Sequence, residues 1–158
     1  MSSPWRTTTL NLLQVLIKLN FPQVKSLTTQ ELDLWLKDPD KSDPLLIDAR
    51  HMEEYELSHL KTAELFTSVQ DLLEDVTCHV STFHTPIVVY CSIGYRSADI
   101  ANSLVKAGFS HVFNLSGGIF QWVNEERPIF QKNQSVKSVH PYNKVWGKLL
   151  KPEYRDPS

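Results

Sequence analysis

Short apolar runs alternate with stretches of helical periodicity through the middle of the chain. Residues 45–47, 87–90 and 112–115 are apolar runs of the length of buried β-strands, and 87–90 is apolar on both faces, which is typical of a central parallel strand. Apolar residues at every third or fourth position predict the helices between these runs. The first of these helices begins near Thr28, three more cover 52–57, 69–80 and 97–107, and the last follows Gly117-Gly118.

This alternation predicts the α/β class, with a central parallel sheet that carries helices on both faces. In such a sheet, ligands bind beyond the carboxyl ends of the strands. Asp48 follows the run 45–47, and Cys91 follows the run 87–90. We therefore expect these two residues at the functional edge of the sheet.

Both ends of the chain extend beyond this pattern. Residues 10–21 form an amphipathic helix pattern, and the segment from Lys132 onwards is rich in proline and expected to be irregular. We expect each to pack on the domain through its apolar side chains. These are Leu12, Val15, Leu16 and Leu19 in the first segment, and Tyr142, Trp146, Leu149 and Leu150 in the second.

Charge and composition exclude several classes of function. The 16 Lys and Arg residues against 18 Asp and Glu residues leave no broad basic surface, so nucleic acid is not an expected partner. The apolar stretch 10–21 is interrupted by polar residues and is shorter than the roughly 20 apolar residues of a membrane span. We expect a soluble, cytoplasmic protein with no membrane partner.

The two cysteines, Cys78 and Cys91, have neither CxxC nor Cys/His zinc spacing, so neither a disulfide scaffold nor a metal site is predicted. Cys91 stands out by its position. The loop CSIGYR, residues 91–96, leads from a strand into a helix expected to begin near Ser97. Backbone amides of such a turn and the helix N-terminus favour negative charge, Gly94 lets the loop curl, and Arg96 adds a cation. These features predict a stabilised, nucleophilic thiolate.

Four blocks of the sequence together resemble the rhodanese family. They are LLIDARHMEEY at 45–55, SHL at 58–60, the strand and six-residue loop at 87–96, and NLSGGIFQW at 114–122. The resemblance covers residues 24–130 as one domain, with a helical extension at 1–23 and a C-terminal extension at 131–158. The sequence departs from the family at Ser58 and Thr62, where family members commonly have glycines.

The resemblance implies a sulfurtransferase in which Cys91 carries a persulfide, with no metal or organic cofactor. The expected partners are a small donor, thiosulfate or a persulfide, and a thiol acceptor, which includes protein thiols. Arg96 would attract anionic donors, and Asp48 and Arg50 would brace the neighbouring strand end as a supporting pair. The backbone amides and side chains around the sulfur would come from Ser92, Ile93, Gly94, Tyr95, Arg96 and Ser97.

Two other functions remain open from the sequence. Rhodanese-like domains also serve as non-catalytic or regulatory binding modules, and the aromatic C-terminal segment is the feature that would dock a partner. Cysteine phosphatases and arsenate reductases also place a thiolate ahead of a helix, but the phosphatases place arginine six positions after the cysteine, where this chain has Ser97. Cys78 is expected to be a passive thiol.

Overall fold

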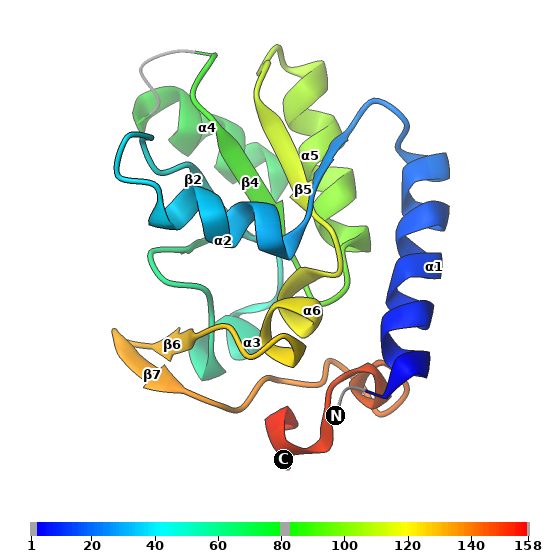
Figure 1. Cartoon of the computed structure of the whole chain (residues 1–158). Helices are drawn as coiled ribbons and strands as arrows, with labels where there is room; N and C mark the ends of the chain where they lie inside the picture. Colours follow the sequence, from blue (N-terminus) through cyan, green and yellow to red (C-terminus); the bar gives the residue numbers. More distant parts are fainter. Residues whose placement is uncertain (1–2, 80–82, 158) are drawn as a thin grey trace.

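The structure is a computed structural model that describes residues 3–79 and 83–157. Its centre is a five-stranded, all-parallel sheet in the order β1-β5-β4-β2-β3, with helices on both faces (Figure 1). The predicted α/β fold with a central parallel sheet is confirmed. The strands are β1 (Lys25–Leu27), β2 (Leu45–Asp48), β3 (Glu64–Leu65), β4 (Ile87–Tyr90) and β5 (Val112–Leu115).

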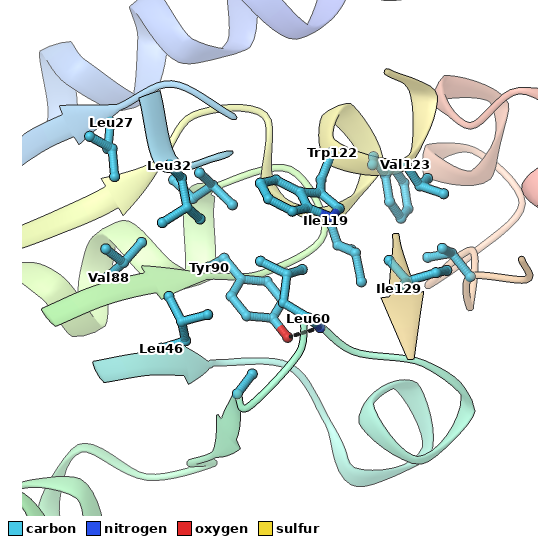
Figure 2. Close-up of a cluster of buried hydrophobic side chains, with 14 of the residues drawn as sticks. Leu27, Leu32, Leu46, Leu60, Val88, Tyr90, Ile119, Trp122, Val123 and Ile129 are labelled. Atoms are coloured by element: carbon cyan, nitrogen blue, oxygen red, sulfur yellow. Dashed lines mark hydrogen bonds between the residues drawn. The ribbon is translucent and has the colours of Figure 1, made fainter. Parts of the chain in front are cut away.

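The sheet separates two hydrophobic cores, and β4 contributes to both because its side chains alternate between the faces. Val88 and Tyr90 belong to the first core, which is covered by α2 (Thr29–Lys37) and α6 (Gly118–Asn124). Figure 2 shows Tyr90 in this core, among residues of α2 and α6. Ile87, Val89 and Cys91 belong to the second core, under α4 (Val69–His79) and α5 (Tyr95–Lys106).

Helix α1 (Pro4–Asn20) begins six residues before the predicted start, with a proline in its first turn. It is buried through Leu10 and Ile17, so the predicted packing face was wrong. Apolar residues lie on both sides of this helix, and periodicity alone does not show which side packs on the domain. The four residues expected to pack, Leu12, Val15, Leu16 and Leu19, are between 50% and 73% exposed. Among residues 3–79 and 83–157, no helix has the length and apolar character of a membrane span.

The C-terminal segment is more regular than predicted. Strands β6 (Ile129–Gln131) and β7 (Gln134–Val136) form an antiparallel hairpin, and short 3₁₀ helices follow at η1 (Trp146–Leu149) and η2 (Pro152–Tyr154). The hairpin turn at Lys132 and Asn133 has positive φ at both residues without a glycine, which hides it from sequence signals. Leu149 and Leu150 of this segment are buried in the first core.

Among the helices beside the site, α5 differs from the prediction at its start. Helix α5 begins at Tyr95, two residues before the predicted start, because Gly94 takes a left-handed conformation and serves as its N-cap. Helix α3 (Met52–Leu57) has its predicted bounds. The predicted end of α4 at Val80 and the side chain of Cys78 lie outside what the structure describes.

The start of α6 packs directly on the loop that follows β4. The backbone N–H groups of Ile119 and Phe120 donate to the carbonyl oxygens of Cys91 and Ser92, at 2.9 and 3.1 Å. Gly118 allows this approach, because a Cβ atom there would lie less than 3.0 Å from both carbonyl oxygens, and its φ is 58°. Gly118 therefore lets the start of α6 hold the backbone of Cys91 and Ser92 in place.

Substitution Gly118→Ala tests this contact. We expect a free energy of unfolding lower by about 3 kcal/mol or more, because the added methyl group overpacks the contact and the positive φ is strained. Gly108→Ala is the matched control: its φ is 106°, but the nearest atom to an added Cβ is 3.9 Å away. The control should lose only about 1–2 kcal/mol, from backbone strain. Equal losses in denaturant titrations of the two variants would contradict a steric role for Gly118.

Candidate active site

Cys91 lies directly after β4, at the carboxyl end of the central strand, and its side chain is buried. The backbone N–H of Gly94 donates to Cys91 Sγ at 3.1 Å. Gly94 reaches this position through a φ of 115°, a conformation that side-chain-bearing residues rarely adopt. The loop thus folds back on its own cysteine, and α5 begins immediately afterwards.

Ser97 lies on the first turn of α5 beside the same sulfur atom. Its Oγ is 3.4 Å from Cys91 Sγ and 2.6 Å from Asn114 Oδ1. The Asn114 amide group also donates to the Gly94 carbonyl at 3.0 Å, so this side chain joins β5 to the loop. The single hydroxyl proton of Ser97 can serve only one acceptor at a time, and the shorter contact is with Asn114. Sequence reasoning missed Asn114; its signal was a polar residue in an apolar strand.

The guanidinium group of Arg96 is partly exposed and is paired with a buried carboxylate. It donates through Nη1 and Nη2 to the two carboxylate oxygens of Glu54, at 2.9 and 3.0 Å, and through Nη2 to Ser92 Oγ at 2.9 Å. Ser92 in turn donates to Glu54 Oε1 at 3.1 Å. Glu54 is buried on α3 and also accepts from the His51 backbone N–H at 2.9 Å. Sequence reasoning missed Glu54, because it lies in a helix pattern with acidic neighbours.

The charges of this pair hold each other in the ionised form. Burial raises the pKa of Glu54, but the hydrogen bonds from Arg96 and from the His51 amide, with the charges of Arg96 and Arg50, lower it to about 2. Burial lowers the pKa of Arg96, and its hydrogen bonds to Glu54 and the charge of Cys91 outweigh that effect and raise it. The pair therefore remains ionised throughout the neutral pH range.

Asp48 and Arg50, the expected supporting pair, meet at the end of β2 and are both buried. Arg50 Nη2 donates to Asp48 Oδ2 at 2.7 Å and to the carbonyl oxygen of Ser58 at 2.6 Å. The hydroxyl group of Tyr90 donates to Asp48 Oδ2 at 2.7 Å, which links β2 to β4. Burial lowers the pKa of Arg50, but the charge and hydrogen bonds of Asp48 raise it by more.

The turn that departs from the family pattern keeps a glycine-like backbone. Thr62 has a φ of 64°, in the left-handed region that favours glycine. Ser58 is buried and extended, and its carbonyl oxygen is the acceptor for Arg50. The two departures therefore leave a defined turn beside the supporting pair.

Both extensions of the chain reach the loop. Gln14 of α1 donates through Nε2 to the Ile93 carbonyl oxygen at 2.7 Å, and Phe21 contacts the ring of Tyr95 edge to face, with 5.6 Å between ring centroids. Tyr142 and Trp146 of the C-terminal segment border the opening above the cysteine. This opening has a volume of about 170 Å³ and is lined by Cys91, Ser92, Ile93, Tyr95, Arg96, Tyr142 and Trp146.

The structure thus brings most of the predicted site residues to one place. Cys91 and Ser97 share contacts at the sulfur, Gly94 supplies an amide, and Ser92 and Arg96 join through Glu54. Asp48 and Arg50 form a separate buried cluster against Tyr90. Within residues 3–79 and 83–157, no group of three or more His, Cys, Asp or Glu residues is placed to hold a metal ion.

Substitution Glu54→Gln tests the buried ion pair. The pKa of Glu54 is depressed to about 2, so its contribution to stability is complete above its ordinary pKa and is lost as the pH falls through the folded-state value. From about pH 5 to about pH 2, the free energy of unfolding of the parent should therefore fall by about 3 kcal/mol more than that of Glu54→Gln. Denaturant titrations across this range measure the difference.

The matched control is Glu53→Gln, which changes the exposed neighbour on the same helix. It should retain the acid profile of the parent protein. Identical acid profiles for the parent and Glu54→Gln would refute the role of the pair.

The chain is similar to several curated proteins. It is 33% identical over 85 residues to the thiosulfate sulfurtransferase GlpE of Haemophilus influenzae, which covers 54% of this chain and 78% of that protein. It is 32% identical over 103 residues to a probable adenylyltransferase/sulfurtransferase MoeZ of Mycobacterium tuberculosis and 32% identical over 84 residues to a tRNA uridine(34) hydroxylase of Protochlamydia amoebophila. The match covers 65% and 50% of this chain, respectively, but only 26% of each of these two longer relatives.

Solved structures agree on the fold. A protein from Bacillus halodurans superimposes with a TM-score of 0.62 at 20% identity, over 88% of this chain and 97% of its own. A rhodanese-like domain protein from Staphylococcus aureus gives a TM-score of 0.53 at 24% identity, over 63% of this chain and 91% of its own. At these identities the likeness concerns the fold.

The family model for the rhodanese-like domain matches residues 28–125. This match contains β2, β4, β5 and the whole loop around Cys91, and it covers more than half of the chain. Together with the relatives and the parallel sheet, it identifies this chain as a member of the rhodanese-like domain family.

Proposed function

We propose that this protein is a sulfurtransferase that carries sulfur as a persulfide on Cys91. The observation that carries the proposal is the position of the sulfur atom. It lies at the carboxyl end of the central strand, within 3.1 Å of the Gly94 amide and 3.4 Å of the Ser97 hydroxyl. Relatives named as sulfurtransferases, such as that of Haemophilus influenzae, support the same reaction class.

In the first step, the Cys91 thiolate attacks the outer sulfur atom of a donor such as thiosulfate. A new S–S bond forms, the S–S bond of the donor breaks, and sulfite leaves with its electron pair. The product is a persulfide anion on Cys91. The Gly94 amide faces this charge, and the first amides of α5 have no acceptor within the helix, which favours an anion at this end.

In the second step, a thiolate acceptor attacks the terminal sulfur atom of the persulfide. The bond between the two sulfur atoms breaks, Cys91 leaves as a thiolate, and the acceptor becomes the persulfide. With cyanide as acceptor, the product is thiocyanate. Ser97 can turn its hydroxyl proton from Asn114 towards Cys91 whenever the sulfur is anionic.

The Arg96 contacts favour this reaction over phosphate ester hydrolysis. Arg96 follows Cys91 by five positions, and two of its nitrogens donate to Glu54. A guanidinium committed to a buried carboxylate has fewer donors for the oxygens of a phosphoryl group. We therefore expect negligible hydrolysis of an aryl phosphate.

Mass spectrometry of the intact protein tests the proposal directly. After incubation with thiosulfate, the parent protein should gain the mass of one sulfur atom, and cyanide should remove it with release of thiocyanate. Cys91→Ser should gain none, because its hydroxyl group is a far weaker nucleophile than a thiolate. Cys78→Ser is the control and should behave like the parent.

Two results of this experiment would contradict the proposal. A parent protein that gains no sulfur from thiosulfate, from an organic thiosulfonate or from an organic persulfide would overturn the proposal and favour a binding module. A sulfur adduct that persists in Cys91→Ser would assign the chemistry to another residue.

A further inference from the structure

The opening above Cys91 has an aromatic wall that comes from outside the matched domain. Tyr142 and Trp146 lie beyond residue 125, where the family match ends, and both line the opening with Ile93 and Tyr95. Apart from the cysteine and the polar tips of the aromatic side chains, the polar groups of the lining come from Ser92 and Arg96. An organic group that approaches the sulfur therefore meets mainly carbon.

The backbone of the C-terminal segment is strained where it places Tyr142. This residue has a φ of 65°, uncommon for a side-chain-bearing residue. The Asn143 N–H donates to the Pro141 carbonyl oxygen at 2.7 Å, which closes a tight three-residue turn centred on Tyr142. The Tyr142 N–H donates to His140 Nδ1 at 3.0 Å. Strain of this kind persists only where the surroundings impose it, and it gathers at functional sites.

The remainder of the segment is anchored to the domain. Asn124, at the end of α6, donates to the Leu149 carbonyl oxygen at 2.8 Å and accepts from the Lys151 N–H at 2.9 Å. Arg6 of α1 donates to the Lys148 carbonyl oxygen at 3.0 Å, where the segment passes the start of α1 (Figure 1). The aromatic wall is consequently preorganised, which lowers the entropic cost of binding.

The one charged residue in this lining offers little to a dianion. Arg96 forms two hydrogen bonds to the carboxylate of Glu54, and the pair carries no net charge. The ring of Tyr142 lies over the guanidinium, with 4.5 Å between its carbon and the ring centroid. Donors are therefore distinguished by their apolar contacts with the lining more than by their charge.

We propose that the sulfur donor of this protein carries an aromatic or similarly bulky apolar group, which packs between Tyr142 and Trp146 while its sulfane sulfur meets Cys91. This inference rests on the proposed sulfurtransferase function and specifies its substrate class. The size of the opening agrees: its volume is about 170 Å³. An apolar cavity of roughly 150 Å³ accommodates benzene.

Two donors of equal charge isolate the apolar contact. Benzenethiosulfonate and methanethiosulfonate each carry one negative charge and transfer one sulfur atom to the Cys91 thiolate, with benzenesulfinate or methanesulfinate as the leaving group. The measurement is the second-order rate constant of Cys91 persulfide formation, followed by rapid acid quench and intact-protein mass spectrometry. Because the leaving groups differ, the ratio of the two rate constants is compared between proteins.

Removal of either ring should lower the ratio of benzenethiosulfonate to methanethiosulfonate by about tenfold, because the aryl group loses an aromatic contact. Tyr142→Gly removes one ring and suits the positive φ, and Trp146→Ala removes the other. Val145→Ala is the control on the same segment: it is 69% exposed, does not line the opening, and should keep the parent ratio.

The outcomes separate the two proposals. Persulfide formation at the same ratio in the parent, Tyr142→Gly and Trp146→Ala would overturn the assignment of an apolar donor and leave the sulfurtransferase function standing. A parent that forms no persulfide with either donor would overturn both. If Trp146→Ala fails to fold, Tyr142→Gly alone decides, since its exposed ring is not part of the hydrophobic core.

Discussion

The geometry of the loop depends on the buried carboxylate of Glu54. Four hydrogen bonds converge on it, two from Arg96, one from Ser92 and one from the His51 backbone. A buried, ionised carboxylate is stable only when its oxygens accept hydrogen bonds or pair with a cation. The loop and α3 must therefore take up their positions together. The same pairing cancels the charge of Arg96 and leaves an apolar opening above Cys91.

The domain that the family shares does not complete this site by itself. The match covers residues 28–125, whereas Gln14 holds the Ile93 carbonyl from one side and Tyr142 and Trp146 border the opening from the other. The extensions also contact each other through Arg6 and the Lys148 carbonyl oxygen. The site thus combines the loop of the shared domain with an aromatic wall from the C-terminal segment, and this wall is where we place donor selection.

Local patterns predicted the elements that are long or bounded by clear signals. The buried runs that became β2, β4 and β5 stand out because the centre of a parallel sheet is apolar on both faces. Strands β1 and β3 have three and two residues, too few for any periodicity to show. The β6–β7 hairpin was missed because Lys132 and Asn133 form its turn without glycine.

The sequence by itself determined that Cys91 follows the central strand and precedes a helix, because both features arise from neighbouring residues. Only the tertiary structure decided which groups surround the sulfur. Glu54 pairs with Arg96 across 42 positions of sequence, and Tyr142 reaches the loop from a segment with no periodic pattern. Likewise, α1 is buried through Leu10 and Ile17 and not through its more numerous leucines on the other side. Periodicity records where apolar residues lie on an element, whereas burial and ion pairing depend on what that element packs against.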